Sequence, residues 1–213
     1  MKKRITFFAV IFLLSLLLSG CFDIYQNITR DSNGFDRNII KVTLNKTMID
    51  MGNSFGESGA IDYNDIFKDD DPELNEYKRF GAYVSKINSE LDIGYLIEMS
   101  LNYRDSAVTN AINQSKDSFI HKYNGKNMTI HIDFANKSGS SGDDGGMATA
   151  VMSSGKYRLV VSKKCVANIR RVTLKTNEGE SDVSFFDVVD GYLIEIPIPI
   201  LFASAIDIYI HSA

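Results

Sequence analysis

The sequence predicts an α+β protein: a mostly antiparallel β-sheet, two main helices in the first half of the chain and an all-β C-terminal portion. Two observations support the first half of this prediction. Apolar residues alternate with polar ones at a period of two in several short segments, which is typical of half-buried strands. Two other segments repeat apolar residues at three- and four-residue spacing, which is typical of helices. From residue 147 onward only the two-residue period remains, interrupted by Gly and Asn residues, and this pattern favours strands joined by turns.

The amino terminus has the layout of an export signal. Three basic residues at positions 2–4 precede an apolar run from Ile5 to Leu18. A helix of this run would be about 21 Å long, whereas the hydrocarbon core of a bilayer is about 30 Å thick. A basic start, a short apolar middle and a small-residue end are typical of a cleaved signal peptide. We therefore expect a signal peptide over residues 1–20 and a single mature domain over residues 21–213.

The last four residues of this segment, Leu18-Ser19-Gly20-Cys21, resemble the lipobox of bacterial lipoproteins. The resemblance implies that Cys21 receives a diacylglyceryl thioether, that a signal peptidase cuts before it, and that its new amino group is often acylated. Two or three acyl chains attach a protein to a membrane far more firmly than one. The alternative is an uncleaved anchor, or a core helix with a chance cysteine.

The remaining composition excludes some classes of function. Without residues 2–4 the chain has 20 basic and 27 acidic side chains, a net charge near −7. We therefore expect no nucleic-acid partner, since such proteins carry a basic patch. The second cysteine, Cys165, has no partner if Cys21 carries lipid. It is either a reactive thiol or, as its apolar neighbours favour, a small buried residue.

A β-hairpin is expected directly after the lipid site. Apolar residues alternate over Phe22–Thr29, turn residues follow at Asp31–Gly34, and Phe35–Leu44 reads as the second strand. Residues 45–70 are less regular, and a loop is expected over residues 52–68. Gly52–Gly56 matches the G-x-S-x-G pattern of a hydrolase nucleophile elbow at Ser54, but the strand–turn–helix context is missing.

The first main helix is expected to start at Pro72, with Asp71 as its cap. Its apolar stripe consists of Leu74, Tyr77, Phe80, Val84, Ile87 and Leu91. Residues 93–103 then predict the clearest strand of the chain. The second helix is expected from Asp105 towards Ser115.

A further one-sided strand, residues 128–134, places His131 and Asp133 on the same face. They are weak candidates for metal ligands, because zinc sites take three or four protein ligands and only His121 and His211 remain to complete one. An exposed polar strand face is the favoured interpretation. No phosphate-binding or dinucleotide-binding motif occurs, so we expect no cofactor.

Residues 136–146, rich in Gly and Ser, predict a flexible loop or a boundary between sub-lobes. Beyond them six strands are expected, at residues 148–152, 156–162, 169–176, 183–189, 192–197 and 205–211. Pro197 and Pro199 end the fifth of these or place it at an edge, and a single helical turn is expected at Ile198–Phe202.

The layout of the body resembles that of the LppM-like envelope lipoproteins, on the residues "GCFDIYQNIT" and "GKYRLVV…GYLIEIPI". The resemblance implies an α+β domain with a hydrophobic cavity, and lipid or glycolipid binding. It transfers no individual site residue. The relatives carry a membrane segment near the carboxyl end, whereas this sequence ends at Ala213 on a predicted strand.

These patterns favour a non-catalytic, lipid-anchored protein of the bacterial envelope that binds an apolar ligand or a partner protein. The alternative is a structural or surface-interaction lipoprotein that uses loops 52–68 and 136–146. A hydrolase that uses Ser54 or a His131/Asp133 site is the least favoured function. Because Phe22, and not aspartate, follows Cys21, we expect the outer membrane or cell surface over the inner membrane.

Overall fold

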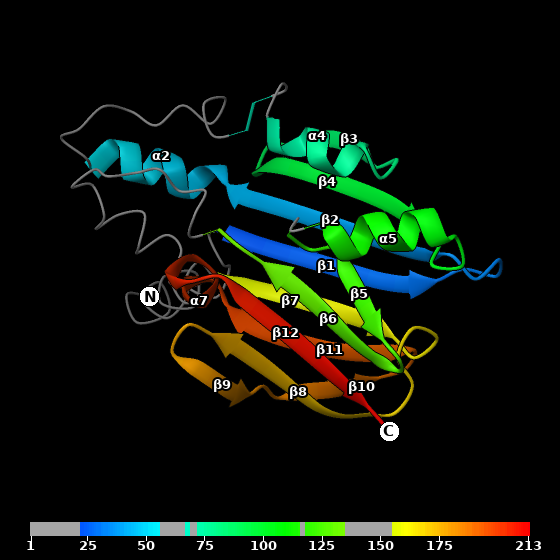
Figure 1. The fold of residues 1–213 in the computed structure, drawn as a ribbon. Helices are drawn as coiled ribbons and strands as arrows, with labels where there is room; N and C mark the ends of the chain where they lie inside the picture. The colour runs from blue at the N-terminus through cyan, green and yellow to red at the C-terminus, as the bar shows by residue number, and fades with distance from the viewer. Residues whose placement is uncertain (1–21, 56–66, 69–71, 116–117, 135–154) are drawn as a thin grey trace.

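The computed structural model describes residues 22–55, 67–68, 72–115, 118–134 and 155–213 (Figure 1). Two β-sheets form the framework. Sheet A has seven strands in the order β10-β11-β7-β1-β2-β4-β3, and sheet B has five in the order β5-β6-β12-β8-β9. The strands of sheet A are β1 (Phe22–Arg30), β2 (Asp36–Asn45), β3 (Tyr83–Asn88), β4 (Asp92–Leu101), β7 (Lys156–Ser162), β10 (Phe185–Val188) and β11 (Gly191–Pro197). Those of sheet B are β5 (His121–Asn124), β6 (Asn127–Ile132), β8 (Ile169–Thr176), β9 (Gly179–Asp182) and β12 (Ile206–Ser212). The helices are α2 (Lys46–Phe55), α4 (Pro72–Lys78), α5 (Ser106–Gln114) and α7 (Ile198–Ala203).

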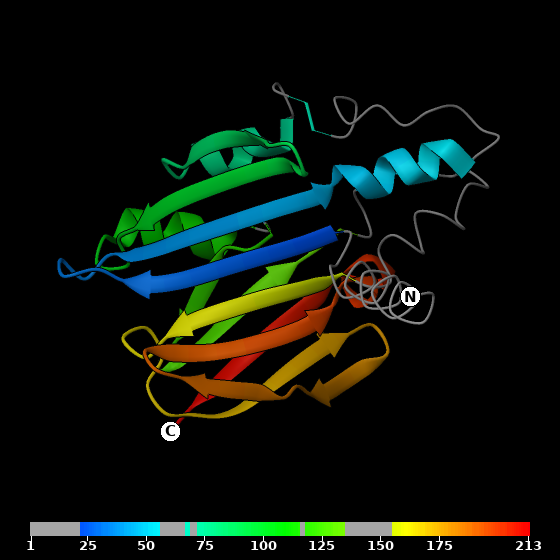
Figure 2. The same ribbon diagram turned by 180° about the vertical axis from the view of Figure 1, so that it is seen from behind.

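The hydrophobic core lies between the layers. Sheet B covers one half of sheet A, and α4 and α5 cover the other half on the same side, near β3 and β4 (Figures 1 and 2). We call this covered side the inner face of sheet A. Ile24, Gln26 and Ile28 of β1 point inward and are fully buried, whereas Tyr25 between them is exposed. The period of two thus fills one face of each strand with the Ile-rich core that the sequence predicted.

The N-terminal hairpin is confirmed. β1 and β2 pair in register from Phe22 with Leu44 to Arg30 with Asp36. In the turn, the Asp31 carboxylate accepts hydrogen bonds from the backbone N–H of Asn33 and Phe35. Gly34 has a positive φ of 84°, a conformation that suits a residue without a side chain.

The α+β class is confirmed in its broad form, with one difference in strand direction. β1 also pairs with β7, and this pair is parallel. The other strand pairs of the described residues are antiparallel. β7 lies beside β1 because of pairing between residues far apart in the sequence. A local pattern of apolar and polar residues does not predict which strands will pair.

The first main helix is much shorter than predicted. α4 ends at Lys78, and Val84 and Ile87 of its supposed stripe lie in strand β3. The chain reverses at Gly81, which has a positive φ of 74°. The N–H groups of Phe80 and Ala82 both donate to the Tyr77 carbonyl and close the turn. β3 is then stabilised by its pairing with β4, a contact that outweighs the helical spacing.

The loop prediction for residues 52–68 is wrong at its start. α2 continues directly from β2 and includes residues 52–55, while residues 56–66 lie outside the described residues. Other elements agree with expectation: α5 begins after Asp105, whose carboxylate caps the N–H groups of Ala107 and Val108. α7 begins behind Pro197, where β11 ends.

The C-terminal strands agree closely with the predicted pattern. β7 and β8 have the predicted bounds, and β10, β11 and β12 differ by a few residues at their ends. Two short strands, β5 and β9, were not predicted. The strand expected at 148–152 and the loop at 136–146 lie outside the described residues. Within the described part of the chain, no helix is long and apolar enough to cross a membrane.

Candidate functional site

Several predicted site residues cannot be placed. The lipobox, Leu18 to Cys21, lies outside the described residues, so lipidation of Cys21 stays a prediction. The structure does place Ser54, which lies in helix α2. Its hydroxyl donates to the Asp50 carbonyl at 2.8 Å, one helical turn back. A serine bonded to its own helix backbone lacks the strained strand–helix turn of a nucleophile elbow.

The His131 and Asp133 pair does not form a joint site. His131 Nδ1 lies 2.8 Å from Asp207 Oδ1, on the neighbouring strand β12. The Asp133 backbone N–H bonds to the Ser118 hydroxyl instead. The structure therefore brings His131 to Asp207, across a strand pair that the sequence pattern did not predict. Among the described residues, no three His, Cys, Asp or Glu side chains gather as a metal site would require.

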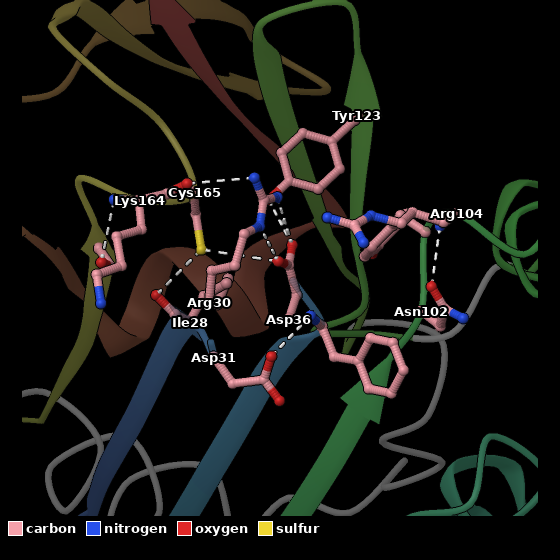
Figure 3. A network of polar contacts seen from close by, with 12 residues as sticks. Ile28, Arg30, Asp31, Asp36, Asn102, Arg104, Tyr123, Lys164 and Cys165 are labelled. Carbon is pink, nitrogen blue, oxygen red and sulfur yellow. Dashed lines mark hydrogen bonds and ion pairs between the residues drawn. The ribbon is translucent and has the colours of Figure 1, made fainter. Parts of the chain in front are cut away.

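The strongest polar cluster is one that the sequence did not predict (Figure 3). Asp36, at the start of β2, is 1% exposed and accepts from three side chains. Arg30 Nε donates to Asp36 Oδ1 at 2.6 Å, and the Tyr123 hydroxyl donates to Oδ2 at 2.5 Å. His121 Nε2 lies 3.1 Å from the same Oδ2. Cys165 Sγ lies 4.0 Å from Oδ1.

This cluster ties both sheets together. Asp36 and Arg30 belong to sheet A, whereas His121 and Tyr123 belong to β5 of sheet B. Arg30 also donates to the Lys164 carbonyl at 3.2 Å. A signal for it was present in the sequence: Asp36 occupies an inward-facing position of the predicted second strand, where an acid requires partners.

The electrostatics of the cluster follow from burial and pairing. Burial alone would raise the pKa of the Asp36 carboxyl, but the hydrogen bonds from its three donors outweigh burial and lower that pKa to about 2. Burial lowers the pKa of His121, so its ring is neutral at neutral pH. We assign the ring proton to Nε2, which can then donate to Asp36. Nδ1 is left buried without a hydrogen-bond partner among the described residues.

Cysteine, histidine and aspartate are the residue types of a thiol protease triad, but the geometry differs from one. The His121 nitrogen that faces the cluster bonds to Asp36, and the thiol of Cys165 also points to Asp36 and to the Ile28 carbonyl. Burial raises the pKa of Cys165 to about 12, so the thiol stays protonated at neutral pH. The cluster therefore acts as a structural link between the sheets.

A second buried cluster joins the side-chain amides of Gln26 and Asn38 to the Phe119 carbonyl and the Tyr157 hydroxyl. The Gln26 amide donates to Asn38 Oδ1 at 2.9 Å and to the Phe119 carbonyl at 2.8 Å. Asn38 Nδ2 also donates to that carbonyl, at 2.9 Å, and the Tyr157 hydroxyl donates to Gln26 Oε1 at 2.5 Å. These bonds hold the chain at Phe119, which has a positive φ of 64°, just before β5. This cluster too is structural, because its groups satisfy one another.

A concave site lies between the turn that follows α4, the end of β4 and helix α5. It is an open groove of about 640 Å³. Its lining residues are Arg79, Phe80, Ser100, Leu101, Asn102, Ala107, Val108, Ala111, Gln114 and Ser115. The walls are mainly apolar, and the Arg79 guanidinium lies 5.3 Å from the Phe80 ring centroid. A groove of this size and lining, with one cationic group, suits an amphiphilic molecule.

Comparisons with known proteins give little. No protein-family model matches the chain, and no curated protein matches it. Among solved structures, the chain is similar to the NMR structure of the folded domain of the Mycobacterium tuberculosis LppM protein. The two are 12% identical, the similarity covers 91% of each chain, and the TM-score is 0.38. At this TM-score the similarity is too low to support a shared function.

Proposed function

We propose that this chain is a non-catalytic, lipid-anchored protein of the bacterial envelope that binds an amphiphilic ligand. The anchor is supported by the lipobox-like ending of the leader at Cys21. The fold is compatible with it, because β1 begins at Phe22, directly after that cysteine. The observation that carries ligand binding is the mainly apolar groove between the turn after α4, the end of β4 and α5.

The groove and the proposed anchor lie at opposite ends of sheet A. β1 runs from Phe22 to Arg30, and the end of β4 at Leu101 pairs with Asp36, the partner of Arg30. Nine residues of strand separate the two ends by about 26 Å at ~3.3 Å per residue. The ligand would therefore be held away from the bilayer surface, as a carrier holds it, with the outer membrane or cell surface as the proposed location.

The chemistry of the groove indicates the kind of ligand. Phe80, Leu101 and Val108 offer apolar surface for a hydrocarbon portion. Arg79 lies at the same groove and favours an anionic head group, since a guanidinium binds phosphate and carboxylate well. An anionic phospholipid fits both features.

The anchor is tested by Cys21→Ala. We expect this variant to lose incorporation of radiolabelled palmitate and to migrate as an uncleaved precursor, because the thiol is the acceptor of the lipid. Cys165→Ala is the matched control and should label as the wild type does. Labelling that persists in Cys21→Ala would disprove the anchor.

Ligand binding is tested by filling the groove. Ala111 is exposed on α5 and lines the groove, so Ala111→Trp should obstruct it without disturbing the core. We expect native mass spectrometry of the mature chain with phosphatidylglycerol to show binding that falls about tenfold, a cost of ~1.4 kcal/mol, in Ala111→Trp. Asn110→Trp, on the same helix and outside the groove lining, should bind as the wild type does. Equal binding by the two variants would place the ligand elsewhere, and no binding by the wild type would contradict the proposal.

A further inference from the structure

The outer face of sheet A lies opposite the inner face. No described helix or strand lies over it, as Figure 2 shows from that side. Six large apolar side chains are exposed in the described part of the chain. Four of them lie on this face: Tyr25, Tyr83, Phe186 and Val188. Tyr83 is 68% exposed and Phe186 is 56% exposed, and they lie on the two edge strands.

One line of side chains, the central row, crosses the whole face. Its members are successive Cα partners on all seven strands: Phe186, Leu193, Val160, Asn27, Ile39, Glu98 and Tyr83. Five of the seven are apolar or aromatic. The middle member is Asn27, on β1, the fourth of the seven strands. A mainly apolar row that spans an open sheet is unusual for a face that stays in water.

The charges of this face are mostly neutralised within it. Arg158 pairs with Asp23 at 2.9 Å and with Glu195 at 3.2 Å. Arg37 pairs with Glu98 at 2.8 Å. A surface of one sign would repel an identical surface, whereas paired charges lower that repulsion. The face is thus suited to contact with a like face.

We propose that the outer face of sheet A binds a second copy of this chain, around a two-fold axis that runs along β1. The interface around such an axis is isologous: both copies use the same surface, so every contact between two different residues occurs twice. With three strands on either side of β1, it sets Tyr83 opposite Phe186 of the second copy, and Ile39 opposite Val160 of the second copy. Tyr25 and Asn27 lie near the axis and meet their own counterparts.

The direction of the axis follows from the proposed anchor, because an axis across the strands would put the two Phe22 ends at opposite sides of the dimer. Adjacent to the central row lies a charged row with Glu195, Arg158, Tyr25 and Lys41 as successive partners. An axis along the strands packs the central row and this charged row each on its own counterpart. The chosen axis sets Lys41 opposite Arg158 of the second copy, whose charge is already offset by its two acids. It also leaves both Phe22 ends on the same side, as two copies tethered to one membrane require.

The area is sufficient for a stable dimer. The seven strands contain 53 residues, which at ~3.3 Å per residue and ~4.8 Å between strands offer roughly 840 Å² per copy. Standard protein interfaces bury about 800 Å² per partner.

The experiment uses the full mature chain in detergent. Two packed sheets lie about 10 Å apart, too far for a disulfide, so Tyr25→Cys is treated with a short bis-maleimide. We expect it to cross-link to a dimer much faster than Lys175→Cys, which is exposed on sheet B. The wild-type chain, in which Cys165 is the only thiol left if Cys21 carries lipid, gives the background rate of cross-linking. Cross-linking of Tyr25→Cys no faster than that of Lys175→Cys overturns the proposal.

Two introduced charges of opposite sign test the predicted contact between Phe186 and Tyr83 of the second copy, with dimerisation measured by sedimentation equilibrium. Phe186→Glu and Tyr83→Arg should each weaken dimerisation at least about tenfold, the effect of ~1.4 kcal/mol. The double variant should recover it, because each new Glu meets an Arg of the second copy. Leu91→Glu, which removes an apolar side chain 59% exposed in the β3–β4 turn, is the matched control and should dimerise normally. A monomeric wild type, or single variants that dimerise like Leu91→Glu, overturns the proposal.

Discussion

Asp36→Asn is expected to lower the free energy of unfolding by about 3 kcal/mol or more, the cost of removing one partner from a buried ion pair. The carboxylate is 1% exposed, and the amide would place N–H donors against the donors of Arg30, Tyr123 and His121. Both sheets would lose their polar link at once. Urea unfolding followed by far-UV circular dichroism measures the loss, since the chain has no tryptophan.

A surface ion pair supplies the control. Asp182 bonds to Arg171 at 2.6 Å, but both side chains are more than half exposed. Asp182→Asn should cost less than about 1 kcal/mol. If Asp36→Asn cost no more than Asp182→Asn, the cluster would not hold the sheets together.

The second large effect is acid destabilisation in two stages. His121 has a lowered pKa in the folded state, so below pH 6.5 the unfolded chain binds a proton that the folded chain does not. Stability should therefore start to fall as the pH drops below about 6.5. Asp36 has its pKa lowered from 3.8 to about 2, so its contribution is present above pH 4 and lost between about 4 and 2. That second stage amounts to about 2 kcal/mol.

Variants separate the two stages in urea unfolding measured across pH. His121→Gln keeps a donor for Asp36 but does not titrate, so the decline that begins near pH 6.5 should shrink. Asp36→Asn should remove the stage between about pH 4 and 2. Profiles of both variants parallel to that of the wild type would show that other groups control acid unfolding.

Local patterns predicted most of the elements, because the residues of one strand or one helix carry their own signal. The alternation around Phe22 and the turn at Gly34 were enough for the hairpin, and Asp105 was enough for the start of α5. The pattern was insufficient at residues 83–88, where Val84 and Ile87 fit helical spacing as well as a strand. Only pairing with β4 selects the strand there, and that is a contact between segments.

For the candidate sites too, the sequence predicted what lies within one segment but not which segments come into contact. His131 and Asp133 were predicted to share a face, but the partner that His131 contacts, Asp207, lies 76 residues further along the chain. The groove residues come from the turn after α4, from the end of β4 and from α5, and none of these segments is distinctive by itself. Sequence reasoning could not join them, because the contacts depend on how the helices pack on sheet A.

The sequence by itself predicted a signal peptide over residues 1–20 with a lipid site at Cys21, and its alternation of apolar and polar residues predicted a β-rich domain. These properties are local: a length, a charge pattern and a period of two. Only the tertiary structure decided that β7 lies parallel to β1, that Asp36 meets His121 across the core, and that no described helix or strand covers the outer face of sheet A. Such outcomes depend on which strands become neighbours, and that choice is made by burial summed over the whole chain.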